Sequence, residues 1–98
     1  MDLSVVIALY NERDSLPELL ERIRSVLTAS LGENKPEPPL YEVIFVDDGS
    51  TDGSWDFISE QAAQDSRIHG IRFRRNYGKS AALYCGFEAA LGNVVITM

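Results

Sequence analysis

Two adjacent carboxylates, Asp47 and Asp48, follow directly on the short apolar run at residues 43–46. A β-branched and aromatic run of this length is typical of a strand that is buried on both faces of a parallel sheet. Ligands of open α/β sheets bind at the carboxyl ends of strands, so the two acids predict a site for hydrogen-bond donors or cations. Gly49 permits a tight turn after them. The next three residues carry side-chain oxygens typical of a helix cap: Ser50, Thr51 and Asp52.

The rest of the chain supplies the elements that must position this site. Apolar runs and alternating patterns predict strands at residues 3–9, 43–46, 69–73 and 94–98. Helical spacing of apolar residues predicts helices at about residues 16–31, 52–65 and 79–91. The alternation in the third strand is typical of a half-exposed edge strand. A proline-rich connector at residues 33–39 is expected to form an exposed loop.

This order of elements, β-α-β-α-β-α-β, predicts the α/β class. We expect a three-layer α/β/α fold with a doubly wound, mostly parallel, Rossmann-like sheet in the strand order 3-2-1-4 and right-handed crossovers. Residues 1–98 should form one domain, with no second domain in the chain. The third helix carries only Lys79 and Glu88 as charged residues, so it should be covered on both sides.

The apolar fourth strand runs to the last residue, which suggests the amino-terminal part of a longer protein. If the polypeptide ends there, the open sheet edge and the third helix would favour a homo-oligomer.

Composition excludes several classes. Nine basic against fifteen acidic residues give a net charge of -6, which argues against nucleic acid as a partner. Cys85 and His69 are single residues of their types, so the chain has neither an internal disulfide nor a zinc framework, and a reducing compartment is expected. The apolar run at residues 5–9 is too short for a signal peptide or a membrane span.

Three nucleotide-binding schemes fit poorly. The loop after the first strand, residues 9–13, has no glycine and therefore lacks the dinucleotide fingerprint. Gly78, Lys79 and Ser80 match the end of a P-loop, but Phe73 stands where its first glycine is required. A receiver domain has its acid pair after the first strand, whereas here the pair follows the second.

Three segments in this order and spacing resemble the family 2 glycosyltransferases. They are S-V-V-I-A-L-Y-N-E at residues 4–12, V-I-F-V-D-D-G-S-T-D at 43–52, and R-N-Y-G-K-S-A-A-L at 75–83. The third segment is most similar to the branch that transfers a sugar to a polyprenyl or dolichyl phosphate. The resemblance covers nearly all of the chain and implies an incomplete glycosyltransferase A-type domain.

The resemblance also implies a nucleotide-sugar site. Its residues would be Ala8, Tyr10, Glu12, Val46 and Asp48, with Asp47 and Lys79 as further members. Their chemistry agrees, because a carboxylate accepts the ring N–H of uracil or guanine and an aromatic ring packs against a base. Asp47 is also a candidate for supporting the strand end or the helix cap. Lys79 begins a helix and could meet a phosphate. The family usually has proline at the position of Ala8.

In this family the fourth strand leads into an Asp-x-Asp motif that holds Mg²⁺ or Mn²⁺, and this chain stops at Met98, where that motif should begin. We therefore expect no catalytic residue and no bound metal in this chain, and an inactive fragment.

The resemblance implies a parent enzyme at the cytoplasmic side of a membrane, which transfers a sugar with inversion. Its partners would be a UDP- or GDP-sugar and a lipid or saccharide acceptor. The alternative hypothesis is a non-catalytic nucleotide-binding or self-associating module.

Overall fold

The structure is a computed structural model that describes residues 3–32, 41–92 and 94–97. Its elements in chain order are β1 (Leu3–Leu9), α1 (Leu16–Gly32), β2 (Tyr41–Asp47), α2 (Ser54–Gln64), β3 (Ile68–Arg72), α3 (Lys79–Ala89) and β4 (Val94–Thr97). The predicted order of elements is confirmed. The predicted loop at residues 33–39 and the last residue of the fourth strand lie outside the described residues.

The four strands form one parallel sheet in the order β3-β2-β1-β4, as predicted. In the register of the central pair, Ala8 lies beside Val46, and Leu9 lies beside Asp47. β1 and β2 therefore end together, and the two loops that follow them lie side by side. β3 lies at an edge, as its alternating pattern predicted.

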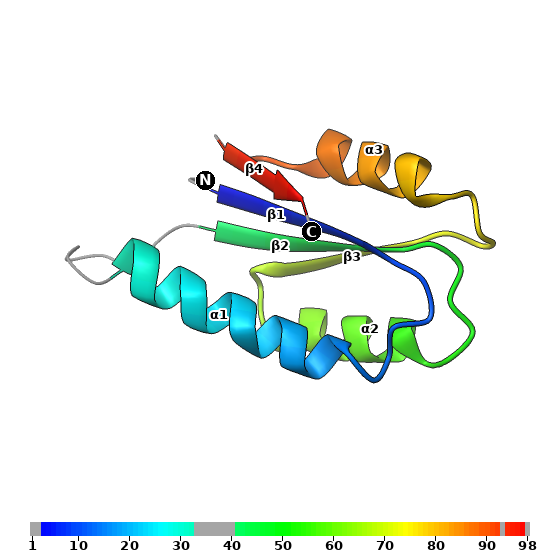
Figure 1. Cartoon of the computed structure of the whole chain (residues 1–98), viewed down its shortest axis with the longest axis horizontal. Helices are drawn as coiled ribbons and strands as arrows, with labels where there is room; N and C mark the ends of the chain where they lie inside the picture. The colour runs from blue at the N-terminus through cyan, green and yellow to red at the C-terminus, as the bar shows by residue number, and fades with distance from the viewer. Residues whose placement is uncertain (1–2, 33–40, 93, 98) are drawn as a thin grey trace.

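Helices cover both faces of the sheet, which gives the predicted three layers (Figure 1). α1 and α2 lie on one face and α3 on the other. The alternation of side chains along β1 and β2 divides the core between these faces. Val5, Ile7 and Phe45 pack with α1 and α2, whereas Val6 and Val46 belong to the cluster on the α3 side.

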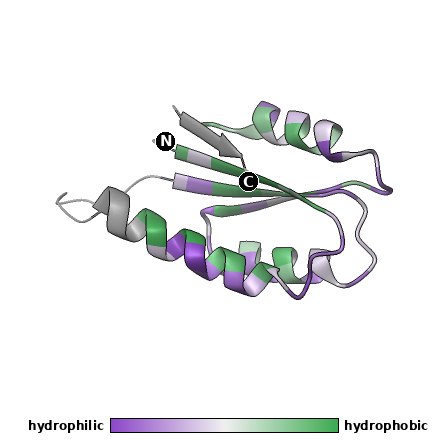
Figure 2. Ribbon diagram, in the orientation of Figure 1, coloured by the Kyte–Doolittle hydropathy of each residue, from purple (hydrophilic) through white to green (hydrophobic). Residues whose placement is uncertain are grey.

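Hydrophobic residues run along the central strands, and hydrophobic and hydrophilic segments alternate along α1 (Figure 2). Leu16, Leu20, Ile23 and Leu27 of α1 are buried, as their helical spacing predicted. In α2, Ile58 is fully buried and Trp55 and Ala62 pack against the same core. Both helices thus bury one face against the sheet.

Within the described part of the chain, α3 is covered on one side, and the predicted cover on its second side stays a prediction. On its inner face, the small residues Ala82 and Gly86 are buried against the sheet, and Leu83 packs against the same cluster. Its outer face carries Tyr84, Phe87 and, just beyond the helix, Leu91, which are 65%, 47% and 73% exposed. The apolar composition of α3 therefore reflects one packed face and one open face.

Element boundaries differ from the predicted ones by one or two residues. α2 begins at Ser54 because Gly53 has a left-handed backbone, with φ 91°, that a helix does not continue through. β3 begins one residue earlier than predicted, and α3 ends at Ala89. Within the described residues, no helix has the length and apolar character that crossing a membrane requires.

Candidate functional site

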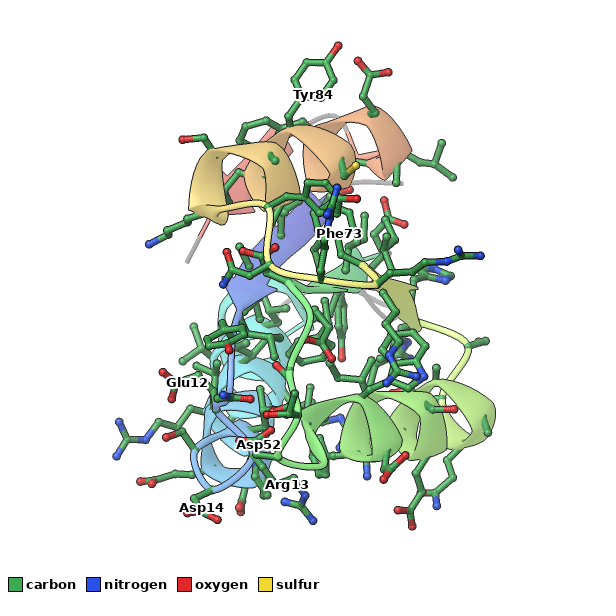
Figure 3. The ribbon with its side chains drawn as sticks, turned by 90° about the vertical axis from the view of Figure 1, so that its right-hand side faces the viewer. Glu12, Arg13, Asp14, Asp52, Phe73 and Tyr84 are labelled. Carbon is green, nitrogen blue, oxygen red and sulfur yellow. The ribbon has the colours of Figure 1, made fainter. Side chains whose placement is uncertain are left out.

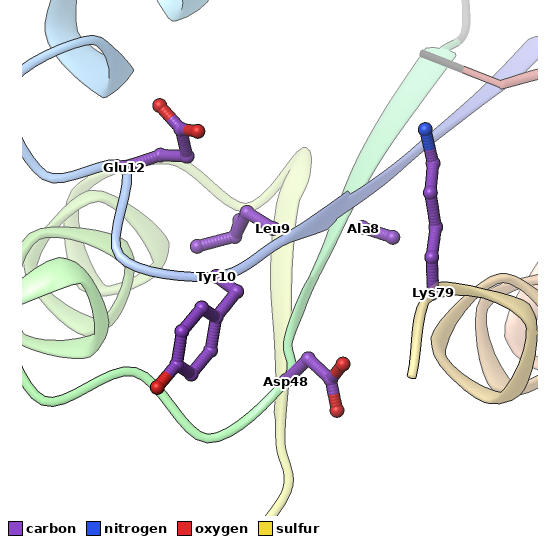
Figure 4. A pocket seen from close by; sticks show the side chains of 6 residues that line it. All are labelled: Ala8, Leu9, Tyr10, Glu12, Asp48 and Lys79. Carbon is purple, nitrogen blue, oxygen red and sulfur yellow. The ribbon is translucent and has the colours of Figure 1, made fainter. Parts of the chain in front are cut away.

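A pocket of about 270 Å³ lies at the carboxyl ends of β1 and β2, where the α/β fold predicts a ligand site. Figure 4 shows side chains from the end of β1, the end of β2 and the start of α3 around it. The pocket is lined by Ala8, Leu9, Tyr10, Glu12, Asp48 and Lys79. The structure therefore brings together five of the seven site residues predicted from the sequence.

The loop after β1 supplies Tyr10 and Glu12. Tyr10 is 45% exposed, so much of its ring is available to a ligand. Between the two residues, Asn11 has a left-handed backbone with φ 52°, a conformation that asparagine adopts more readily than most residues. Ala8, at the end of the strand, contributes a small side chain to the pocket wall.

Hydrogen bonds fasten this loop to the loop after β2. The backbone nitrogen of Asn11 donates to Ser50 Oγ at 2.8 Å, and its side-chain Oδ1 accepts from the nitrogen of Thr51 at 2.8 Å. The backbone nitrogen of Glu12 donates to Ser54 Oγ at 3.2 Å. These bonds hold Asn11 and the backbone nitrogen of Glu12 against the loop after β2.

The loop after β2 supplies Asp48. This residue is 4% exposed, and its backbone nitrogen donates to the carbonyl oxygen of Leu9 at 2.9 Å, which ties the two strand ends together. Its carboxylate accepts hydrogen bonds from the backbone nitrogens of Tyr77 and Gly78. Asp48 therefore joins β2 to the segment before α3.

Gly49 allows this junction. Its φ of 85° favours glycine, and a Cβ there would lie 2.6 Å from the backbone carbon of Arg75 and 2.7 Å from the nitrogen of Asn76. The tight turn predicted at Gly49 is confirmed, and the close approach of a second backbone segment is an additional reason for the glycine.

Asp47 and Val46 do not line the pocket. Asp47 is fully buried, and its Oδ1 accepts a hydrogen bond from the backbone nitrogen of Ser50 at 2.8 Å, which agrees with support of the strand end. Its Oδ2 has no hydrogen-bond partner among the described residues. Val46 is fully buried in the cluster that contains Ala82. Their predicted contact with a nucleotide stays a prediction.

The start of α3 supplies Lys79, an exposed residue whose side chain lies across the pocket from Glu12 (Figure 4). The free backbone N–H groups of a helix start favour anions, and Lys79 adds a positive charge there. In the described ranges, no group of three or more His, Cys, Asp and Glu side chains could hold a metal ion. The described residues therefore do not fit a metal centre.

The predicted helix-capping roles of Ser50 and Thr51 are wrong in their details. The start of α2 has Gly53 as its cap residue without a side-chain cap, and Ser50 and Thr51 bond to Asn11 instead. Asp52 does accept a hydrogen bond from the backbone nitrogen of Ser54, at 3.0 Å. Its carboxyl pKa is lowered, chiefly by the Ser54 hydroxyl, against the opposing effect of burial, with further lowering by the backbone N–H of Arg13.

Sequence reasoning missed the pocket role of Leu9 and the linking roles of Asn11 and Ser54. Leu9 reads as a buried strand residue, which it also is. The polar residues of both loops could have indicated these roles, because loops that follow strands of one parallel sheet lie at the same edge. Which residue of one loop bonds to which residue of the other could be learned only from the structure.

An open parallel α/β sheet with a pocket at the carboxyl ends of its strands defines the class of doubly wound α/β domains, which bind their ligands at that edge. A family model, described as glycosyl transferase family 2, matches residues 4–98. The chain belongs to this family.

Curated relatives agree with this assignment. The chain is 47% identical over 96 residues to the undecaprenyl-phosphate 4-deoxy-4-formamido-L-arabinose transferase of Aeromonas hydrophila subsp. hydrophila, covering 97% of this chain and 27% of the relative. It is 46% identical to the protein of the same name from Pseudomonas fluorescens SBW25, covering 97% and 26%. The chain thus spans about a quarter of the length of these relatives.

Solved structures share the fold. The mannosyltransferase PcManGT from Pyrobaculum calidifontis, in complex with GDP-Man and Mn²⁺, matches with a TM-score of 0.73 and 25% identity over 95% of this chain and 25% of its own. S. aureus TarS 1–349 in complex with UDP matches with a TM-score of 0.78 and 22% identity over 100% and 27%. The fold is therefore that of glycosyltransferases of the A type.

Proposed function

We propose that this chain is the nucleotide-sugar-binding part of a glycosyltransferase, and that its pocket holds the nucleoside of the donor. The observation that carries the proposal is the convergence of Tyr10, Glu12 and Asp48 on one pocket at the ends of β1 and β2. An aromatic ring packs against a heterocycle, and carboxylates accept hydrogen bonds from base N–H and ribose O–H groups. Family membership and the nucleotides in the two similar structures support this assignment.

Each residue has a distinct role in this proposal. Tyr10 packs against the base, Asp48 accepts its ring N–H, and Glu12 accepts from the ribose or from a base donor. Lys79 and the free N–H groups of the first turn of α3 face the phosphates. Ala8 leaves room for the nucleoside. Two buried residues support the pocket without lining it. Val46 packs in the core, and Asp47 accepts the hydrogen bond that holds the turn at Ser50.

For the whole protein, we propose transfer of the sugar to a polyprenyl phosphate, the acceptor class in the names of the curated relatives. An acceptor phosphate oxygen attacks the anomeric carbon and forms the new C–O bond with inversion. The C–O bond to the diphosphate breaks, and the nucleoside diphosphate leaves with that electron pair. The attacking oxygen is already anionic near neutral pH, so no strong base is required. A lipid acceptor would place this reaction at the cytoplasmic face of a membrane.

A divalent cation, Mg²⁺ or Mn²⁺, belongs to the proposal for the whole protein only. Mn²⁺ in the similar mannosyltransferase supports it. The described residues supply no cluster of carboxylates or histidines suited to such an ion, so we assign none of them as a metal ligand.

Isothermal titration with UDP and GDP tests the proposal. We expect the wild type to bind at least one of them, and Glu12→Gln and Asp48→Asn to weaken that binding by about tenfold, the loss of one charge-assisted hydrogen bond. Glu60→Gln changes an exposed acid on α2, away from the pocket, and should bind like the wild type. Equal affinities of all four proteins would overturn the nucleotide site.

The outer face of α3 favours a second candidate, a self-associating module. Tyr84, Phe87 and Leu91 are exposed there, and apolar surface of this kind is typical of contact sites. Light scattering with increasing concentration would test this candidate, with Tyr84→Glu as the disrupting variant. A monomer at all concentrations would exclude self-association.

A further inference from the structure

Asp52 connects the two loops that build the pocket, although it does not line the pocket itself. Its Oδ2 accepts a hydrogen bond from the backbone nitrogen of Arg13 at 3.1 Å. Its Oδ1 accepts from both the backbone nitrogen of Ser54, at 3.0 Å, and the hydroxyl of Ser54, at 2.5 Å. Figure 3 shows Asp52 from the loop after β2 beside Glu12 and Arg13 from the loop after β1.

The hydroxyl of Ser54 connects Asp52 to Glu12, because it forms hydrogen bonds with both residues. Ser54 is fully buried, and its Oγ also accepts a hydrogen bond from the backbone nitrogen of Glu12 at 3.2 Å. A hydroxyl has one proton and two lone pairs. Because the proton is donated to Asp52, the hydroxyl is oriented with its lone pairs free to accept from the Glu12 N–H. Asp52 thus sets the orientation of the group that holds the Glu12 backbone.

The position of Glu12 depends on such bonds because its neighbour Asn11 has a left-handed backbone. A non-glycine residue persists in this conformation only where its surroundings hold it. Asn11 has bonds to Ser50 and Thr51 on one side, and the bonds of Glu12 and Arg13 hold the other. Loss of Asp52 would remove the acceptor of the Arg13 N–H and leave the Ser54 hydroxyl, which holds the Glu12 N–H, without its own acceptor.

We propose that Asp52 is a positioning residue of the nucleotide pocket: through the Ser54 hydroxyl and the Arg13 amide, it holds Glu12 in place to meet the donor. The inference rests on the proposed nucleotide site and deepens it. It assigns to this exposed aspartate a contribution to nucleotide affinity that is made without touching the nucleotide.

The test uses Asp52→Ala with Asp56→Ala as the matched control. Asp56 is an exposed acid in the first turn of α2, the helix that follows Asp52, so the control removes an equal charge near the same helix start. Titration with UDP and GDP should show affinity reduced about tenfold for Asp52→Ala, because binding must then order a Glu12 residue that is no longer held in place. The affinity of Asp56→Ala should equal that of the wild type.

A double-mutant cycle separates positioning from general destabilisation. If Asp52 acts through Glu12, Asp52→Ala should cost little further affinity in a Glu12→Ala background, because coupled residues are not additive. Asp52→Asn retains a carbonyl oxygen for Ser54 and should lose less affinity than Asp52→Ala. The asparagine variant also tests the proposal if the alanine variant folds poorly. Full additivity in the cycle, or an affinity for Asp52→Ala equal to that of Asp56→Ala, would overturn the proposal.

Amide hydrogen exchange without nucleotide gives an independent measurement. The Glu12 and Arg13 amides should exchange faster in Asp52→Ala than in Asp56→Ala, since their acceptors are disturbed only in the former. Unchanged exchange would overturn the positioning role. Failure of the wild type to bind either nucleotide would overturn the proposed function, and the exchange rates would then decide the positioning role alone.

Discussion

The Oδ1 atom of Asp48 lies 2.7 Å from the backbone nitrogen of Tyr77, which donates a hydrogen bond to it. The Oδ2 atom accepts a second bond, at 3.0 Å, from the nitrogen of Gly78, the residue that precedes α3. A carboxylate has about four acceptor positions. Asp48 can therefore hold this segment and still accept a hydrogen bond from a base in the pocket.

This double role predicts two separable effects of changing Asp48. Asp48→Ala should lower the free energy of unfolding by about 2–3 kcal/mol, because it leaves two backbone N–H groups without acceptors in a partly buried site. Asp48→Asn keeps one oxygen and should lose less stability, while both variants weaken nucleotide binding. Urea unfolding measures the stability. An alanine variant as stable as Asp56→Ala would contradict the anchoring role.

Tyr10 should contribute to affinity and little to stability, because its ring is half exposed. Tyr10→Ala should weaken UDP or GDP binding by about 1–3 kcal/mol, the usual effect of removing an aromatic ring from a base. Tyr10→Phe keeps the ring and should bind nearly as well as the wild type. Titration calorimetry checks both, and equal affinities of the alanine and phenylalanine variants would argue against stacking.

Gly86 packs α3 against the sheet, and a Cβ there would overlap with the Cγ1 atom of Val6, because the two carbons would lie far closer than van der Waals contact allows. Gly86→Ala should therefore destabilise the fold by about 1–3 kcal/mol through overpacking, despite the better helix propensity of alanine. Ser80→Ala, at an exposed position of the same helix, serves as the control. A stability gain in Gly86→Ala, measured in urea, would show that α3 adjusts its distance from the sheet.

Glu42 is 2% exposed and lies on β2, far along the strand from the pocket. Its Oε2 accepts hydrogen bonds from Ser4 Oγ at 2.5 Å and from the nitrogen of Leu91 at 2.7 Å. Glu42→Ala should destabilise the fold by about 2–4 kcal/mol because both donors lose a charged partner. Glu42→Gln retains an acceptor and should cost less. Unfolding curves of the two variants that coincide would contradict this ranking.

The lowered pKa of Asp52 predicts how its contribution to stability depends on pH. A carboxyl group whose pKa is lower in the folded than in the unfolded state stabilises the fold fully above its ordinary value of 3.8. That contribution disappears as the pH falls through the folded-state pKa. The stability difference between wild type and Asp52→Asn should be constant near neutral pH and shrink in acid. A stability difference that grows in acid would show that folding raises the pKa of Asp52, which would contradict the prediction.

The sequence by itself determined the elements, their order and the chemistry at the strand ends. Apolar runs and helical spacing are local patterns, so they predicted the strands and helices to within one or two residues. The parallel α/β order predicted where a ligand would bind, and Ala8, Tyr10, Glu12, Asp48 and Lys79 do line one pocket.

Only the tertiary structure decided how adjacent residues divide their roles. Asp47 and Asp48 look alike in the sequence, but Asp47 ends β2 fully buried, whereas Asp48 lies one residue further on, at the pocket. The bonds of Asp52 to Arg13 and of Glu42 to Leu91 join residues far apart in the chain. No local pattern encodes such pairs, because their partners become neighbours only when the strands align in one sheet.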